Sequence, residues 1–358
     1  MFLALMGSTF AETEIVHEKG QVSGVESKMV EAPEGGIVTP AGIIEGMYKQ
    51  QTIEVELLSG DNEGETVEVI NDVTGNPFDI SVEEGDKVFL YAQDFGSGEM
   101  QYFIQDYWHS DGLLIWTLVF LAAVVVIGGK AGLKAIVSLG SSVALVFLVL
   151  LPALKNGMSP VPLTVGISAV IILVTHLIIT GVGKKSWIAM LGTLGGVLAA
   201  VLLVYLVSAS SGLTGLGTED GRILAVNSPG LNFQGLLFSG IIIGALGAVM
   251  DIGISIASGL HEVKMHKPSV KRAELIKSGM NIGKDIMGSM LNTLIFAYIG
   301  SAMMSMVLFY HLQTDVLELV NQGFIAEEIV RSLVGSLGLL VTIPLTAVLA
   351  GYLFGKKS

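Results

Sequence analysis

The chain has 358 residues, of which 51% are hydrophobic and only 14% are charged, and its formal net charge is −13. A soluble domain usually has about a quarter charged residues, so this composition argues against an ordinary soluble protein. The basic residues form no patch with interleaved aromatic residues, which argues against nucleic-acid binding, and the absence of cysteine excludes a disulfide framework and a thiolate metal site.

Residues 1–11 are apolar and end in small residues, which fits the last part of a secretory signal segment that lacks its basic start. The alternative is an apolar terminus without regular structure. We favour the signal segment, because the orientation derived below places residue 12 onward outside the cell. Residues 12–42 are polar and contain several glycines and prolines, so they are predicted to form an irregular acidic lead-in.

Residues 43–107 are predicted to form a small extracytoplasmic β-domain, either a sheet or a barrel-like fold. Apolar and polar residues alternate over 52–57 and 65–69, two more strands follow over 87–92 and 100–105, and turn residues separate these runs. Residues 12–111 also contain 22 of the 32 acidic residues but only four lysines. Because the chain from Gly112 onward has 15 basic and 10 acidic residues, a domain boundary is expected near Asp111.

Residues 108–358 are predicted to form a transmembrane helical domain. Seven apolar stretches are long enough to cross about 30 Å of hydrocarbon, and they have no polar face to turn toward water. The predicted fold class is therefore an α-helical polytopic membrane bundle of about seven transmembrane helices, with a small N-terminal extracytoplasmic β-domain. The expected spans are residues 108–127, 133–154, 160–182, 187–207, 236–260, 286–310 and 333–354.

The distribution of basic residues over the loops predicts the orientation. Counted from an outside start, the inside segments contain twelve lysines and arginines, and the outside loops contain only Lys155, Arg222 and Arg331. Positive charge accumulates in cytoplasmic loops. The pattern predicts a multi-pass plasma-membrane protein with the β-domain outside and the C-terminus in the cytoplasm.

Two expected spans carry polar residues at membrane depth. In the fifth span, Asp251, Ser255, Ser258 and Glu262 fall on one helix face, and in the sixth span Asn281, Asp285 and Asn292 do the same. A charged side chain near the membrane centre costs about 3 kcal/mol or more, so it needs a reason. The two faces predict a polar pocket between the fifth and sixth spans that binds a cation or a proton.

The ligand of this pocket is expected to be a hard cation such as Na⁺, Mg²⁺ or Ca²⁺, or a proton, because all donors are oxygens. His176 and Glu262 are candidates for a proton relay. The alternatives are structural: Lys284 pairs with Asp251 or Asp285, the polar residues hold helices together, or His176 is a hydrogen-bonded interior histidine.

A zinc enzyme is not predicted. The segment 261–266 resembles the H-E-x-x-H motif with one residue too many, and five residues advance a helix by about 500°, so the two histidines point about 140° apart. A nucleotide site is not predicted either. An aspartyl dyad of Asp251 and Asp285 would make an intramembrane enzyme, but no complete set of catalytic residues accompanies it.

Four segments resemble the YibE/F-like family of bacterial membrane proteins. They are residues 244–258 (GALGAVMDIGISIAS), 278–298 (SGMNIGKDIMGSMLNTLIFAY), 128–134 (GGKAGLK) and 83–87 (EEGDK). The similarity covers residues 45 to 310, and it implies a multi-pass membrane protein with an outer N-terminal domain. It implies little about activity, and it places Asp251, Asn281 and Asp285 within the family's motif segments.

Two functions from different classes follow as hypotheses. The first is a transporter or permease, with Asp251 and Asp285 at the site of a small ion or solute. The second is a recognition or assembly module, whose outer domain binds a partner protein or a second copy while the bundle anchors it in the lipid bilayer. An intramembrane enzyme is the third and weakest hypothesis.

Overall fold

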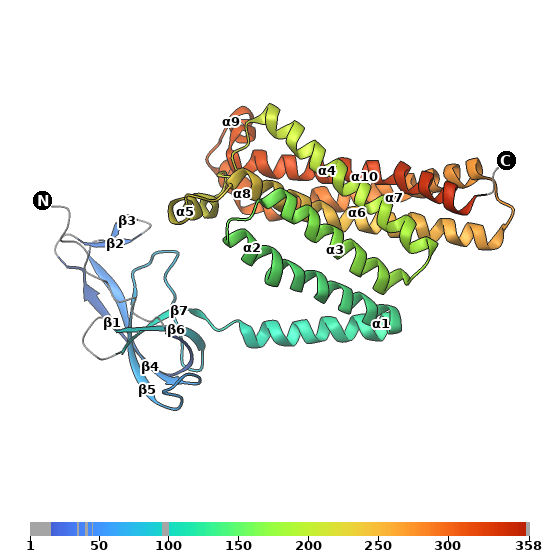
Figure 1. The fold of residues 1–358 in the computed structure, drawn as a ribbon. Coiled ribbons are helices and arrows are strands. Elements are labelled where there is room, and N and C mark those ends of the chain that lie inside the picture. Colours follow the sequence, from blue (N-terminus) through green and yellow to red (C-terminus); the bar gives the residue numbers. More distant parts are fainter. Residues whose placement is uncertain (1–15, 34–35, 40–41, 45, 95–99, 356–358) are drawn as a thin grey trace, which may run out of the picture. The chain divides into compact units, whose positions relative to one another are not determined.

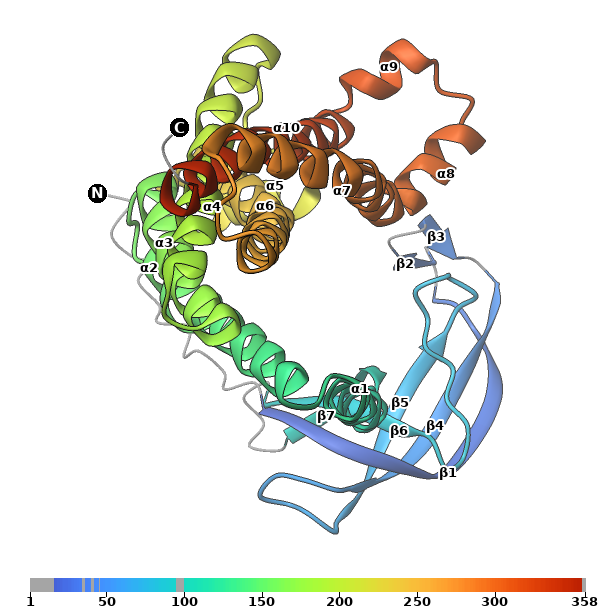
Figure 2. The same cartoon turned by 90° about the vertical axis from the view of Figure 1, so that its right-hand side faces the viewer.

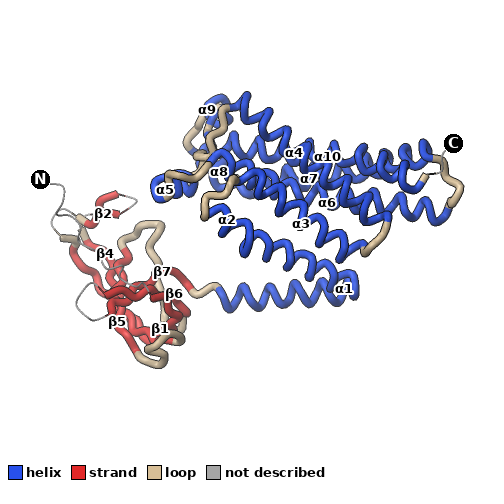
Figure 3. The backbone as a smooth tube through the Cα atoms, viewed as in Figure 1, coloured by secondary structure: helices blue, strands red, loops and turns tan. Residues whose placement is uncertain are grey.

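The computed structural model describes residues 16–33, 36–39, 42–44, 46–94 and 100–355, so the expected signal segment at residues 1–11 lies outside the described residues. Within the described part all strands precede all helices (Figure 3). The chain divides into two compact units, Met1–Phe120 and Leu121–Ser358.

The elements follow one another along the chain as coloured in Figure 1. The strands are β1 (Val16–Glu31), β2 (Ile37–Thr39), β3 (Gly42–Ile44), β4 (Met47–Leu57), β5 (Thr66–Val73), β6 (Lys87–Asp94) and β7 (Met100–Tyr107). The helices are α1 (Ser110–Leu145), η1 (Val146–Leu150), α2 (Leu151–Lys155), α3 (Pro160–Thr180), α4 (Lys184–Ser211), α5 (Glu219–Asn227), α6 (Phe233–His266), α7 (Arg272–Ser301), α8 (Met303–His311), α9 (Val316–Asn321) and α10 (Gly323–Phe354).

The N-terminal domain is a curved, half-barrel sheet of five antiparallel strands in the order β5-β4-β1-β6-β7, and β2 pairs with β3 separately. The alternation predicted for residues 52–57 places Ile53, Val55 and Leu57 of β4 in the core. Val88 and Leu90 of β6 pack against them. The strands expected over 52–57, 65–69, 87–92 and 100–105 are confirmed as parts of β4, β5, β6 and β7.

The prediction of an irregular lead-in over residues 12–42 is wrong for the greater part of this segment. Residues Val16–Glu31 form β1, the central strand of the sheet, which pairs with β4 on one side and β6 on the other. The inward positions of its first half are Glu18, Gly20 and Val22. Because two of these three residues are not apolar, the sequence lacks the alternation that identifies a half-buried strand.

Asp111, in the first turn of α1, connects this helix to the sheet. Its carboxylate accepts hydrogen bonds from Lys19 Nζ of β1 at 3.0 Å, from Lys87 Nζ of β6 at 2.9 Å and from Trp108 Nε1 at 2.9 Å. Lys19 Nζ also lies 5.0 Å from the centre of the Trp108 ring. The start of α1 is therefore held by two strands of the same unit.

In the helical unit, the count of seven spans is reproduced only in part. Among the described residues, five helical segments are long and apolar enough to cross a membrane, or six if α7 and α8, bent by 59° at their junction, form one span. The first segment, Ser110–Lys155, covers two of the expected spans. Gly129 interrupts it with φ 53° and ψ −129°, and the chain reverses there (Figure 1).

The reversal at Gly129 depends on small residues. Its positive φ is readily adopted by glycine alone. A Cβ on Gly132 would lie only 2.1 Å from the carbonyl oxygen of Val124, so the two sides of the turn touch through backbone. The sequence 128–134 thus forms the turn of a helical hairpin, whose two arms correspond to the helices expected over residues 108–127 and 133–154.

Helix α10 packs against α4, α6 and α7, and Figure 2 shows it between α4 and α7. Small residues allow this close packing. A Cβ on Gly192 or Gly196 of α4 would lie 2.0 or 1.9 Å from the hydroxyl oxygens of Thr346 and Thr342 on α10, respectively. Such small residues are typical of helix contacts in membranes.

The burial of Glu18 leads to a prediction about how the stability of the N-terminal domain depends on pH. Glu18 is 4% exposed, and its Oε2 atom has no hydrogen-bond partner in the described part of the chain. Burial, with a smaller effect from the charge of Asp61, raises the pKa of Glu18 above 4.5. The folded state therefore binds the proton more tightly than the unfolded state, and this contribution to stability is lost as the pH rises through the raised pKa.

We expect Glu18→Gln to raise the thermal unfolding midpoint of the N-terminal domain of the full-length protein, with a larger increase at pH 7.5 than at pH 4. Protease resistance of the domain during heating measures the midpoint. Glu26→Gln, on the exposed side of the same strand, is the matched control and should leave it unchanged. An equal effect of Glu18→Gln at both pH values would contradict the assignment.

Candidate functional site

Asp251 lies near the middle of α6. This helix begins after Asn232, whose side-chain oxygen accepts a hydrogen bond from the backbone N–H of Gly235 at 2.8 Å, as an N-cap does. From Phe233, Asp251 is the nineteenth residue of a helix of 34. At about 1.5 Å per residue it is therefore far from both helix ends.

Asp251 lines a groove of about 420 Å³ between the second half of α1, α3 and α6. The other polar side chains of the groove are Ser138 and Ser142 of α1 and Thr175 of α3. The remaining lining is apolar, with Phe147 among the residues that form it. The groove thus combines one carboxylate and three hydroxyls in apolar surroundings.

The hydroxyls hold each other in place. Ser138 Oγ donates a hydrogen bond to Thr175 Oγ1 at 3.0 Å, and Ser142 Oγ lies 3.4 Å from the same Thr175 atom while donating to the Ser138 carbonyl oxygen at 2.9 Å. In contrast, no hydrogen bond or ion pair reaches the Asp251 carboxylate from any residue that the structure describes. Its oxygens remain available to a ligand.

Asp251 does not lie in the pocket predicted between the fifth and sixth spans. No residue of α7 lines the groove of Asp251. The side of α6 that meets α7 carries Ile256 and Gly259, which approach Gly283 and Ile282. Since Asp251 and Ile256 are five residues apart, they point about 140° apart around the helix.

The other predicted site residues are dispersed. Asn281, Asp285 and Asn292 are exposed on α7, Ser255 and Ser258 are half-buried on α6 outside the groove, and Glu262 is exposed nearer the end of α6. The structure therefore does not bring Asp251 and Asp285 into one groove as an aspartyl dyad. Within the described residues Lys284 forms no ion pair with either aspartate.

His176 of α3 lies behind the groove and does not line it. Its ring is fully buried, with Nδ1 2.7 Å from the carbonyl oxygen of Ile172 and Nε2 3.4 Å from Thr193 Oγ1 of α4. The short contact favours Nδ1 as the nitrogen that carries the proton. Both nitrogens thus contact groups of the chain itself, as the alternative of an interior histidine predicts.

The groove contains a single acidic side chain, and no three histidine or acidic residues in the described part of the chain come together as a metal site would require. Divalent calcium is usually bound by six to eight oxygens, often from several carboxylates. One carboxylate with neutral hydroxyls better matches a single positive charge.

Sequence reasoning missed Ser138, Ser142 and Thr175. Ser138 and Ser142 are four residues apart in an apolar stretch, so they share a helix face, and Thr175 precedes His176. This spacing was available in the sequence. What it lacked was the contact of the second and third spans with the fifth.

Family models match both parts of the chain. Residues 116–356 match the model described as YibE/F-like protein, and residues 44–107 match the model described as YibE/F family N-terminal domain. No curated protein and no solved structure matches the chain. The resemblance seen in the sequence is thereby confirmed.

Gly253, two residues after Asp251, yields a prediction about the packing behind the groove. A Cβ at this position would lie 2.4 Å from Thr193 Oγ1 and 3.2 Å from the carbonyl oxygen of Ala189 on α4. We expect Gly253→Val to destabilise the purified protein by about 1–3 kcal/mol through overpacking. Gly247→Ala, where a Cβ meets nothing within 4 Å, is the control and should retain full stability in the same thermal unfolding assay.

Proposed function

The chain belongs to the YibE/F-like protein family, whose function is unknown, and we propose that it is a membrane permease that carries a proton or Na⁺ through the groove around Asp251. The observation that carries this proposal is the Asp251 carboxylate, which has no partner from the described chain and shares its groove with three hydroxyls. This site replaces the one expected between the fifth and sixth spans.

The membrane arrangement that the permease needs is part of the proposal. Counting the hairpin at Gly129 as two spans, and α7 with α8 as one, gives seven spans together with α3, α4, α6 and α10. The twelve basic residues of the inside segments, against three outside, favour an outer β-domain and a cytoplasmic C-terminus in the bacterial plasma membrane.

The energy of a charge at membrane depth supports transport over simple packing. An ionised carboxylate at mid-membrane costs about 3 kcal/mol or more unless something compensates it. Ser138 and Thr175 already bond to each other, so these hydroxyls do not require Asp251 to hold the helices together. A proton or a Na⁺ ion neutralises the single charge, and the hydroxyl oxygens replace part of the ion's hydration shell.

The same set of one carboxylate and three hydroxyls also makes ion binding reversible. One charge and a few neutral oxygens bind a monovalent ion well enough to admit it and weakly enough to release it, which conduction requires. Asp251 is the ion-binding group, and Ser138, Ser142 and Thr175 are the neutral ligands. His176 has no part in this proposal, because both its nitrogens already contact the chain.

We expect Asp251→Asn to reduce flux at least tenfold in proteoliposomes of the purified full-length protein, because the neutral amide no longer binds the ion. A pH-sensitive dye and a Na⁺-sensitive dye, each with an imposed gradient, measure the two candidate fluxes. Asp220→Asn makes the same chemical change at an exposed site on α5 and should retain wild-type flux. Equal flux of both ions through wild type and Asp251→Asn would refute the permease.

The orientation has its own test, which the absence of native cysteine makes simple. In intact cells we expect a membrane-impermeant maleimide to label an Asp61→Cys variant in the outer domain but not a Lys264→Cys variant, which should react only after the cells are broken. Labelling of Lys264→Cys in intact cells would reverse the proposed topology.

A further inference from the structure

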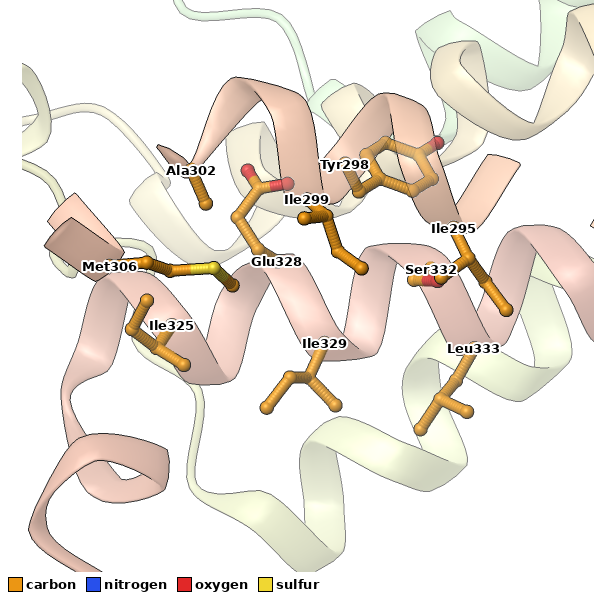
Figure 4. Close-up of a pocket in the computed structure, with 10 residues that line it drawn as sticks. All are labelled: Ile295, Tyr298, Ile299, Ala302, Met306, Ile325, Glu328, Ile329, Ser332 and Leu333. Atoms are coloured by element: carbon orange, nitrogen blue, oxygen red, sulfur yellow. The ribbon is translucent and has the colours of Figure 1, made fainter. Parts of the chain in front are cut away.

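A second cavity, of about 270 Å³, lies between α7, α8 and α10 and shares no lining residue with the groove of Asp251. Ile295 and Ile299 of α7 face Ile329 and Leu333 of α10 across it, and Met306 of α8 closes one end (Figure 4). The volume is slightly below the range of about 300–1,000 Å³ typical of small-molecule sites. It fits a small ligand or the chain of a larger one.

Glu328 is the charged side chain of this mainly apolar cavity. Its side chain is 16% exposed, and its carboxylate lies between Ala302 and Ile299 (Figure 4). Oε1 is 3.5 Å from Arg331 Nε, which is a long contact, and the buried Oε2 has no hydrogen-bond donor from the described part of the chain. Buried polar atoms are normally hydrogen-bonded, so a donor is expected at Oε2.

The charged side chains near Glu328 indicate the charge of the ligand group that donates to Oε2. Glu327, the preceding residue, is buried and accepts a hydrogen bond from the backbone N–H of Gly217 at 3.0 Å. Two carboxyl groups, those of Glu327 and Glu328, therefore lie near the one guanidinium of Arg331. A positively charged ligand is attracted to the Glu328 carboxylate, whereas an anionic ligand is repelled by it.

The apolar residues that line the cavity indicate the chemistry of the rest of the ligand. The side chains of Ile295, Ile329 and Leu333 are 41%, 41% and 51% exposed, so the mouth of the cavity is hydrophobic. With the proposed membrane arrangement, such a mouth faces hydrocarbon rather than water. The ligand therefore needs an apolar body together with a cationic hydrogen-bond donor.

We propose that this cavity binds an aliphatic primary amine, with its ammonium group against the Glu328 carboxylate and its hydrocarbon chain between the isoleucines of α7 and α10. An ammonium–carboxylate hydrogen bond is stronger than a bond to a neutral donor, and the chain buries apolar surface in the cavity. The site is independent of ion transport, because it contains no residue of the Asp251 groove.

Octylamine is the probe, and equilibrium dialysis of the full-length protein in nanodiscs of phosphatidylcholine, a lipid without a primary amine, measures its binding. We expect saturable binding of one octylamine per chain, and at least tenfold weaker binding of octan-1-ol and octanoate. The Glu328→Gln variant should lose at least tenfold in octylamine affinity. The matched control Glu318→Gln, at an exposed position of α9, should bind as the wild type does.

A second variant keeps the test decisive if Glu328→Gln fails to fold. Ile299→Trp enlarges a 36% exposed side chain that lines the cavity and leaves the carboxylate intact. It should also weaken octylamine binding at least tenfold. Asp251→Asn should bind octylamine normally even where it lacks ion flux, which separates the failure of this proposal from the failure of the permease.

Nanodiscs that contain phosphatidylethanolamine identify the source of the amine. Competition with octylamine would support an amine-bearing lipid of the bilayer, and its absence would support a smaller free amine. Binding of octan-1-ol as tight as that of octylamine, undiminished octylamine binding to Glu328→Gln and Ile299→Trp, or no saturable binding at all would each overturn the proposal.

Discussion

In the proposed membrane arrangement, the main constraint on the helical unit is that the membrane interior offers no water to its polar groups, so each must find a partner within the chain. Most of them do: Ser138 donates to Thr175, His176 contacts Ile172 and Thr193, and Thr342 donates to the Gly338 carbonyl oxygen. Asp251 has no such partner in the described chain, and Glu328 has one for a single oxygen. The two proposed sites are therefore built around acids whose bonding the described chain leaves incomplete.

The same constraint explains how the scaffold holds these acids. Helix α10 packs against α4, α6 and α7, with glycines of α4 against threonines of α10, so backbones approach closely without large polar groups. Glu328 lies on the α7 side of this central helix, and Asp251 lies on the side of α6 that turns toward α1 and α3. Each acid is thus placed by rigid helices at the border of the packed core.

The sequence predicted elements well where a single periodicity dominated, as in β4 and in the apolar stretches of α3, α4 and α6. It failed at β1, because Glu18 and Gly20 take inward positions that apolar residues usually fill. It identified Asp251 as an unusual acid within an apolar helix but paired it with the next expected span, since chain neighbours are the default partners of a helix. The face of α6 that meets α7 carries Ile256 and Gly259. Isoleucine and glycine occur on every side of this helix, so the sequence does not reveal which of them contact α7.

The attachment of Asp111 to Lys19, Lys87 and Trp108 makes one carboxylate the common acceptor for three donors. Two of these donors are ammonium groups from neighbouring strands, so the loss of the carboxylate would leave two positive charges close together without a counterion. The junction between the sheet and the first turn of α1 thus depends on a single side chain.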